Sequence, residues 1–417
     1  MERDSKLMIR LSASEKALLE ETAAEQGLKV ASWARRVLLR GAKAEMGSED
    51  TPAYGLNGSG RARPELLSLF CGPGGLDEGF RQAGFRTALA TDIDKDCVAT
   101  FRHNHPEAKT FTADIAALTP RKLDRIYGGE FAPFGVIGGP PCQSFSVSNV
   151  HQKDDDPRHN LPLAYAKLLK ALNRRRPISF FLFENVPGLL GPRHKERYLR
   201  FKEEFQLAGF KVYEALLDAK DYGVPQERPR VFIVGINAKA YPGAEWLPPP
   251  PGDEVRTVRD TIAGLPEPVH NAKGLDPETF PVHPNHWCLV PKSRKFGNAN
   301  LKEGQMFGRS FRTLRWDAPS WVVAYGHREV HVHPRGHRRL SIYEAMLLQT
   351  FPHQYELLGN MTAQVRLVSE AVPPRLGFSI AESIRKALGL PAARQERKGA
   401  TSRRKEPRHP ATADLFT

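Results

Sequence analysis

The chain has 417 residues and a formal net charge of +14 at pH 7, with 40% hydrophobic and 26% charged residues. This composition is typical of a folded protein, and the excess of Lys and Arg favours a polyanionic partner such as nucleic acid. No apolar run approaches the roughly 20 residues of a membrane-spanning helix, and the N-terminus lacks the apolar core of a secretory signal. The sequence therefore predicts a cytoplasmic protein that does not associate with membranes.

Residues 1–44 are predicted to form a small separate unit. A short strand precedes two helices, the first of which begins with Ser12 and Glu15 at capping-box spacing. So short a unit cannot bury a core alone, and we expect a homodimer through residues 7–41. The segment resembles the ribbon-helix-helix DNA-binding fold, with an N-terminal helical appendage as the alternative. Residues 45–63, rich in Gly, Ser and charge, are expected to be a linker.

From residue 64 the chain alternates apolar strands with amphipathic helices. This alternation predicts an α/β fold with a doubly wound, mostly parallel, Rossmann-like sheet. Strands are expected at 66–70, 88–91, 134–139, 180–186 and 230–236, and helices at 161–175, 338–351 and 376–390. The expected parts are a catalytic and cofactor-binding domain at 64–240, an irregular functional lobe at 241–311, a return to the catalytic domain at 312–390, and a disordered basic tail at 391–417.

A glycine-rich turn follows the first of these strands. Gly72, Gly74 and Gly75 precede a helix whose free backbone amides can bind a ligand. Asp92 follows at the end of the next strand, where an acid can hold ribose hydroxyls. The pattern indicates an adenosine-type cofactor, and it does not distinguish a dinucleotide from S-adenosylmethionine.

Three further polar segments adjoin later strands. Cys142 follows two prolines after one strand, Glu184 ends the next, and Arg228 and Arg230 precede another. Because ligands of doubly wound sheets bind at the carboxyl ends of the strands, a thiol, a carboxylate and two guanidiniums could converge beside the cofactor loop. No cysteines are paired at zinc-ligand spacing, and the histidine-rich stretch at 325–339 has no acidic or cysteine partner at ligand spacing, so no metal site is expected.

Seven motifs carry a family resemblance over residues 64–390. In chain order they are FCGPGGL, TDID, TADI, GGPPCQSFS, FENV, QERPR and AVPP. This order resembles the cytosine-5 DNA methyltransferases, with the irregular lobe where that family has its target recognition domain. The resemblance implies methyl transfer from S-adenosylmethionine to C5 of a flipped-out cytosine in double-stranded DNA. Ser369 and Glu370 depart from the family's usual Gly-Asn, so the pocket there is expected to differ in shape.

The resemblance also implies a role for each matching residue. Cys142 would add to C6 of the cytosine, Glu184 would hold N3 and the exocyclic amine, and Arg228 or Arg230 would help fix the base and the catalytic loop. The implied cofactor residues are Phe70, Gly72, Gly74, Gly75, Leu76, Asp92, Ile93, Asp114, Ile115, Pro141, Ala371 and Val372. The implied DNA contacts are Gln143, Ser146, Ser148, Arg158 and Gln226, with 144–161 as a catalytic loop that closes over DNA.

Two other functions stay open on the sequence alone. One is an RNA cytosine-5 methyltransferase, although an RNA enzyme needs neither the large lobe nor a DNA-binding N-terminus. The other is a DNA-binding regulator with a vestigial methyltransferase fold, which the intact Cys142, Glu184 and Arg228 disfavour. The sequence does not say whether a restriction enzyme accompanies the protein.

Overall fold

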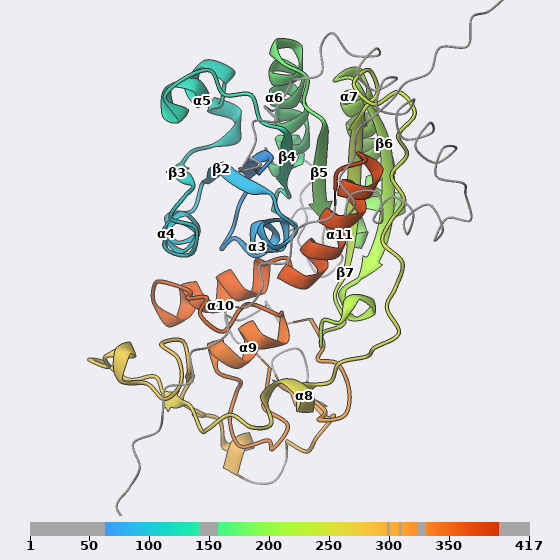
Figure 1. Ribbon diagram of the computed structural model, residues 1–417. Helices are drawn as coiled ribbons and strands as arrows, with labels where there is room; N and C mark the ends of the chain where they lie inside the picture. The colour runs from blue at the N-terminus through green and yellow to red at the C-terminus, as the bar shows by residue number, and fades with distance from the viewer. Residues whose placement is uncertain (1–62, 142–156, 298–300, 308–310, 323–330, 392–417) are drawn as a thin grey trace, which may run out of the picture. The chain divides into compact units, whose positions relative to one another are not determined.

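The computed structural model describes residues 63–141, 157–297, 301–307, 311–322 and 331–391 (Figure 1). The N-terminal unit with its expected dimer segment lies outside these residues, as do the linker except residue 63 and the basic tail except residue 391. Cys142, Gln143, Ser146 and Ser148 also lie outside them. Across the described ranges, no helix has the length and apolar character to cross a membrane.

A seven-stranded sheet in the order β3-β2-β1-β4-β5-β7-β6 forms the centre of the fold (Figure 1). The strands are β1 Glu65–Leu69, β2 Arg86–Asp92, β3 Lys109–Thr112, β4 Gly135–Gly138, β5 Phe180–Asn185, β6 Phe210–Asp218 and β7 Pro229–Asn237. The first five pair in parallel, whereas β7 runs antiparallel to both β5 and β6. The predicted doubly wound, mostly parallel sheet is confirmed, and β3 and β6 are additional to the predicted strands.

Helices cover both faces of this sheet (Figure 1). The helices on the sheet are α3 Gly75–Gln82, α4 Lys95–Asn104, α5 Pro120–Tyr127, α6 Leu161–Arg175, α7 Lys195–Leu207 and α11 Pro374–Ala387. Three others, α8 Val258–Ile262, α9 Ile342–Leu348 and α10 Met361–Glu370, pack into a separate core. Successive residues of a strand point to opposite faces. Accordingly, Phe181 of β5 packs into a core with α5, α6 and α7, whereas Phe180 packs into a second core with α3 and α11.

The region after β7 is irregular, as predicted, and contains two small two-stranded sheets. Their strands are β8 Val269–His270, β9 Trp287–Cys288, β10 Met306–Phe307 and β11 Phe311–Arg312. The irregular chain continues beyond residue 311. Thr313 forms an isolated β-bridge with Val332, and regular helix resumes only at α9. There Ser341 and Glu344 form a capping box, and Glu344 also pairs with the buried Arg338 (Nη1–Oε2 2.8 Å).

The described part of the histidine-rich stretch is packed inside this region. His331 and His333 are buried, and burial lowers the pKa of each to about 4. Within the described ranges, no group of three or more His, Cys, Asp or Glu residues could hold a metal ion. These histidines are neutral at physiological pH and stabilise the fold by packing and hydrogen bonding.

Candidate active site

The reversed direction of β7 brings separate segments of the chain to one edge of the sheet. In the antiparallel pairing of β5 with β7, Asn185 lies opposite Val231 and Glu184 lies opposite Phe232. The first residues of β7 therefore lie where β5 ends, at the carboxyl edge to which β1, β2 and β4 also lead. Arg230, at the start of β7, consequently meets Glu184.

Glu184 and Arg230 form an ion pair with little contact with solvent. Nε of Arg230 lies 3.0 Å from Oε1 of Glu184, and the two side chains are only 10% and 13% exposed, respectively. Burial raises the pKa of Glu184, an effect that the charges of Arg230 and Arg228 oppose. A carboxyl group in this setting can exchange hydrogen bonds with a ligand without competition from bulk water.

Arg228, two residues before Arg230, makes separate contacts. The residue is buried, its backbone N–H donates to Oδ1 of Asp218 at 2.7 Å, and its Nη2 donates to the carbonyl of Ser369 at 2.9 Å. It therefore connects the start of β7 to the end of α10, where the sequence departs from the family pattern. Glu370, the last residue of α10, is exposed, and Ser369 is buried.

The segment that leads to Cys142 passes directly against Glu184. A Cβ atom placed on Gly139 would lie 2.5 Å from the backbone carbonyl oxygen of Glu184 and 2.6 Å from its Oε2, so only glycine fits. Next along the chain, the carbonyl of Pro140 accepts a hydrogen bond from Nδ2 of the buried Asn185 at 3.3 Å. Pro140 is buried and Pro141 is exposed. The start of the cysteine loop is thus fixed at the Glu184–Arg230 pair.

The expected cofactor residues at the ends of β1 and β2 lie together. The N–H of Gly72 donates to Oδ2 of Asp92 at 3.0 Å, and the N–H of Asp94 donates to Oδ1 at the same distance. Burial raises the pKa of Asp92, and these backbone hydrogen bonds oppose the rise. Gly72 has a φ of +54°, with no atom within 4 Å of the position of a Cβ, and Ile93 is 66% exposed. Open space, a carboxylate acceptor and an exposed apolar side chain fit the ribose and base of an adenosine group.

The other two glycines of the turn are required by the protein's own packing. A Cβ on Gly74, whose φ is +92°, would lie 2.5 Å from the hydroxyl of Tyr355. A Cβ on Gly75 would lie 2.3 Å from the carbonyl oxygen of Val372. The buried Ala371–Val372 segment therefore lies against the glycine turn, whereas only Gly72 faces open space.

The remaining predicted cofactor residues differ in exposure. Phe70 is partly buried and has a left-handed φ of +52°, and Leu76 is buried in the core shared by α3 and α11. Asp114 is exposed and accepts a hydrogen bond from the N–H of Ala116 at 2.9 Å, while Ile115 is buried.

Two predicted DNA contacts fall within the described residues. Arg158 lies in a 3-10 turn before α6 and is partly exposed. Gln226 is fully buried, and neither Nε2 nor Oε1 of its amide has a hydrogen-bond partner in the described chain. A contact between Gln226 and DNA would therefore require the surrounding chain to move.

Comparison with known proteins assigns this arrangement to a family. Residues 65–386 match the C-5 cytosine-specific DNA methylase family. The chain belongs to this family. It is 33% identical over 348 residues to the Type II methyltransferase M.MthTI of Methanothermobacter thermautotrophicus, which covers 78% of this chain and 98% of the relative. It is 31% identical to M.FnuDI of Fusobacterium nucleatum, with 78% and 95% covered. A solved prophage-encoded E. coli protein shares the fold, with a TM-score of 0.67, 21% identity, and 78% and 99% covered.

The protein is thus a DNA cytosine-5 methyltransferase, and its methyl donor is S-adenosylmethionine. Of the three functions that the sequence left open, this one is confirmed. The residues at the sheet edge fit the donor, because Gly72, Asp92 and Ile93 together offer space, an acceptor and an apolar surface for its adenosine part.

The other cysteines of the methyltransferase have environments unsuited to a nucleophile. Cys71, Cys97 and Cys288 are buried free thiols. Burial raises the pKa of each, that of Cys288 to about 12. Because the thiolate is the reactive form, these three residues are poor nucleophiles at neutral pH.

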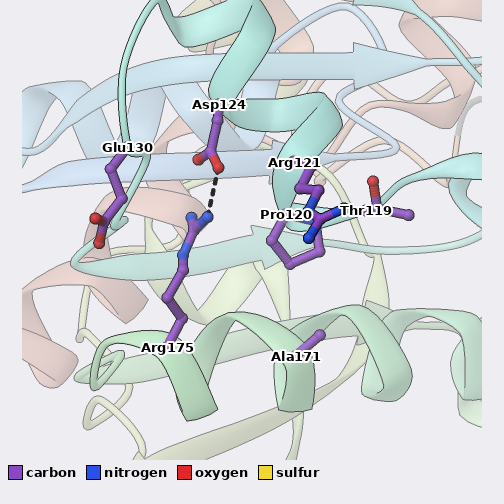
Figure 2. Close-up of a pocket in the computed structure, with 7 residues that line it drawn as sticks. All are labelled: Thr119, Pro120, Arg121, Asp124, Glu130, Ala171 and Arg175. Carbon is purple, nitrogen blue, oxygen red and sulfur yellow. Dashed lines mark hydrogen bonds and ion pairs between the residues drawn. The ribbon is translucent and has the colours of Figure 1, made fainter.

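Sequence reasoning assigned no role to two residues that shape this site. Asn185 holds the chain before Cys142, and Tyr355 packs against Gly74. Asn185 belongs to the FENV motif, so the motif contained a signal, whereas Tyr355 has no local signal. A separate hollow of about 620 Å³ between α5 and α6 contains the Arg175–Asp124 ion pair and no predicted site residue (Figure 2).

Proposed function

We propose that Cys142 is the nucleophile of the methyltransferase and that Glu184 and Arg230 hold the target cytosine beside it. The observation that carries this proposal is the close approach of the cysteine segment to Glu184 at Gly139, together with the hydrogen bond from Asn185 to Pro140. The high pKa values of the other three thiols also support Cys142.

Each residue then has a defined chemical task. The Cys142 thiolate adds to C6, forming an S–C6 bond and moving an electron pair toward C5, which becomes nucleophilic. Glu184 hydrogen-bonds or protonates N3 as negative charge develops there, with Arg230 holding the carboxyl group in place. S-adenosylmethionine, when bound, supplies the electrophilic methyl group. Loss of the C5 proton to water then breaks the S–C6 bond and restores both the aromatic ring and the thiolate.

The geometry of DNA requires the target base to leave the duplex before this reaction. A cytosine stacked in the duplex shields C6 from a thiol, so the base must be flipped into the site. We propose Gln143, Ser146, Ser148 and Arg158 as DNA contacts around the flipped base, and Gln226 as a contact that forms when the chain around it moves. Arg228, which connects the start of β7 to Ser369, would keep the recognition side of this pocket in place.

We propose that the cofactor lies along the ends of β1 and β2. Asp92 would accept hydrogen bonds from the ribose hydroxyls, and Ile93 would pack against adenine. The further residues proposed to line the same site are Phe70, Gly72, Gly74, Gly75, Leu76, Asp114, Ile115, Pro141, Ala371 and Val372.

The irregular lobe at 241–311 is proposed to read the DNA sequence. It supplies scattered basic and aromatic side chains, which suit phosphate and base contacts, and in the structure Lys295 lies 4.7 Å from the ring centroid of Phe311. The relatives M.MthTI and M.FnuDI are Type II methyltransferases. We propose that this enzyme likewise modifies DNA within a restriction-modification system, in the cytoplasm.

The N-terminal segment is proposed to dimerise the enzyme and to add a DNA contact. This proposal rests on the sequence pattern of residues 7–41 alone. Trp33, Val37 and Leu38 are expected on roughly one face of the second helix. Replacing Val37 by Asp would place a charge on this apolar face, and sedimentation of the full chain would then shift from dimer to monomer. A wild-type protein that sediments as a monomer would overturn the proposal.

Transfer of labelled methyl from S-adenosylmethionine to duplex DNA tests the proposed roles. Cys142→Ser should abolish transfer and leave cofactor binding intact, since Asp92 and the glycine turn are unchanged. Transfer by this variant at the wild-type rate would show that Cys142 is not the nucleophile. Bisulfite sequencing of DNA from cells that express the enzyme would identify the methylated target sequence.

A further inference from the structure

Tyr355 connects a segment beyond the recognition lobe to the glycine turn. The residue is 4% exposed, and its hydroxyl lies 2.5 Å from the carbonyl oxygen of Pro73, 282 positions earlier in the chain. A carbonyl oxygen can only accept, so the tyrosine hydroxyl donates this hydrogen bond. The contact therefore fixes the orientation of the Pro73–Gly74 peptide.

His105, the C-cap residue of α4, completes the interaction. Its Nε2 lies 3.1 Å from the hydroxyl oxygen of Tyr355. Because the hydroxyl hydrogen points to Pro73, the hydrogen-bond network assigns the proton to Nε2 of His105, which donates to the tyrosine oxygen. Burial lowers the pKa of His105, so the imidazole is neutral at physiological pH.

The two side chains also define the space around the turn. A Cβ on Gly74 would lie 2.5 Å from the Tyr355 hydroxyl and 3.0 Å from Nε2 of His105. The N–H of Gly74 donates to the carbonyl of Cys71 at 3.0 Å, which closes the turn around Gly72. Gly72 in turn donates a hydrogen bond to Asp92. Three peptide groups of the turn therefore link the contact between Tyr355 and Pro73 to Asp92 on the cofactor side of the loop.

The segment that carries Tyr355 is itself held on both sides. Asn104 of α4 donates from Nδ2 to the carbonyl of Glu356 at 2.8 Å and accepts from its N–H at 3.0 Å. Asn285, in the recognition lobe, makes the same pair of hydrogen bonds with Leu357, at 2.8 and 2.9 Å. The residues that follow Tyr355 are thus held by hydrogen bonds to two other segments, which keeps the tyrosine in a fixed position against the glycine turn.

We propose that Tyr355 is a positioning residue for S-adenosylmethionine, acting through Pro73 to hold the glycine turn in its cofactor-binding shape. The inference rests on the cofactor site proposed above. Tyr355 does not touch the cofactor in this role, and it contributes by lowering the cost of ordering the loop on binding.

Tyr355→Phe tests this role, because it keeps the ring and removes only the hydroxyl. We expect the dissociation constant and KM for S-adenosylmethionine to rise roughly three- to tenfold, the loss typical of one hydrogen bond, with kcat and the KM for DNA unchanged. Tyr222→Phe is the matched control, since Tyr222 is also a buried tyrosine that donates to a proline carbonyl, that of Pro249 at 3.0 Å. The control should retain the wild-type dissociation constant.

Calorimetric titration of the full-length enzyme with S-adenosylmethionine, with Asp92→Ala as a further variant, separates the outcomes. Loss of binding in Asp92→Ala and a selective loss in Tyr355→Phe would support both proposals. If Asp92→Ala loses binding while Tyr355→Phe binds as tightly as wild type, the positioning role is wrong and the cofactor site stands. If Asp92→Ala binds normally, the proposed cofactor site fails, and the role of Tyr355 fails with it.

Discussion

Asp77, in the first turn of α3, should make the enzyme less stable as the pH rises. Its side chain is 1% exposed and accepts hydrogen bonds from the hydroxyls of Ser68 at 2.9 Å and Thr87 at 2.7 Å. Burial raises its pKa to about 7 from an ordinary value of 3.8, and the two hydroxyls oppose the rise. The folded state thus holds this proton more tightly than the unfolded state does. The contribution of Asp77 to stability is therefore greatest at acidic pH and falls as the pH rises through the interval between these values.

The size of the effect follows from that interval. At 1.36 kcal/mol per pKa unit, the ionised Asp77 lowers the free energy of unfolding by about 4 kcal/mol above neutral pH. Asp77→Asn removes the titration and nearly preserves the shape. The stability of the variant relative to wild type should therefore increase by about 2 kcal/mol between about pH 5.5 and about pH 8.5.

Urea unfolding at the two pH values measures this difference. Asp124→Asn is the control, because the hydrogen bond from the N–H of Phe131 and the contact with Arg175 lower the pKa of the Asp124 carboxyl. Stability from a lowered pKa is lost only as the pH falls through acidic values, so the control difference should stay flat over this range. An equal difference for Asp77→Asn at both pH values would refute the reasoning.

Three other substitutions test the site. Glu184→Gln removes the charge beside Arg230. It should slow single-turnover methyl transfer by roughly 10²- to 10⁴-fold and leave the DNA affinity in a binding assay unchanged. A near-normal transfer rate would exclude the proposed role of Glu184. Asn185→Ala removes the hydrogen-bond partner of the Val186 N–H and of the Pro140 carbonyl. It should reduce the free energy of unfolding, measured in urea, by about 1–3 kcal/mol. In kinetic assays it should slow methyl transfer more than it weakens cofactor binding. Gly74→Ala should cost about 1–3 kcal/mol of stability from its backbone conformation alone, and an unchanged urea midpoint would contradict the fixed turn.

Elements with strong local patterns could be predicted from the sequence. The helix at 161–175 agrees with α6, since a proline early in the helix and a regular apolar period define it locally. β5 lies within its predicted range, because a fully buried strand is a continuous apolar run. β6 was missed because it is an edge strand whose Lys211 and Glu214 point to solvent and interrupt the apolar pattern.

The assembly of the site depends on features that local patterns do not contain. Nothing in the residues of β7 specifies that it runs antiparallel to β5, yet this direction is what brings Arg230 to Glu184. The glycines were expected to let the backbone approach a ligand, and the atom nearest to a Cβ placed on Gly74 is the hydroxyl of Tyr355, 281 positions away. The order of the motifs therefore predicted which residues belong to the site, whereas their contacts with one another depend on packing between distant segments of the chain.

Trapping of the covalent adduct tests the central claim most directly. In a duplex that carries 5-fluorocytosine at the target position, the fluorine on C5 cannot leave as a proton does, so the S–C6 bond should persist after methyl transfer. We expect mass spectrometry of the digested adduct to locate the DNA on the peptide that contains Cys142. An adduct on Cys71, Cys97 or Cys288, or no adduct under conditions in which unmodified DNA is methylated, would contradict the account.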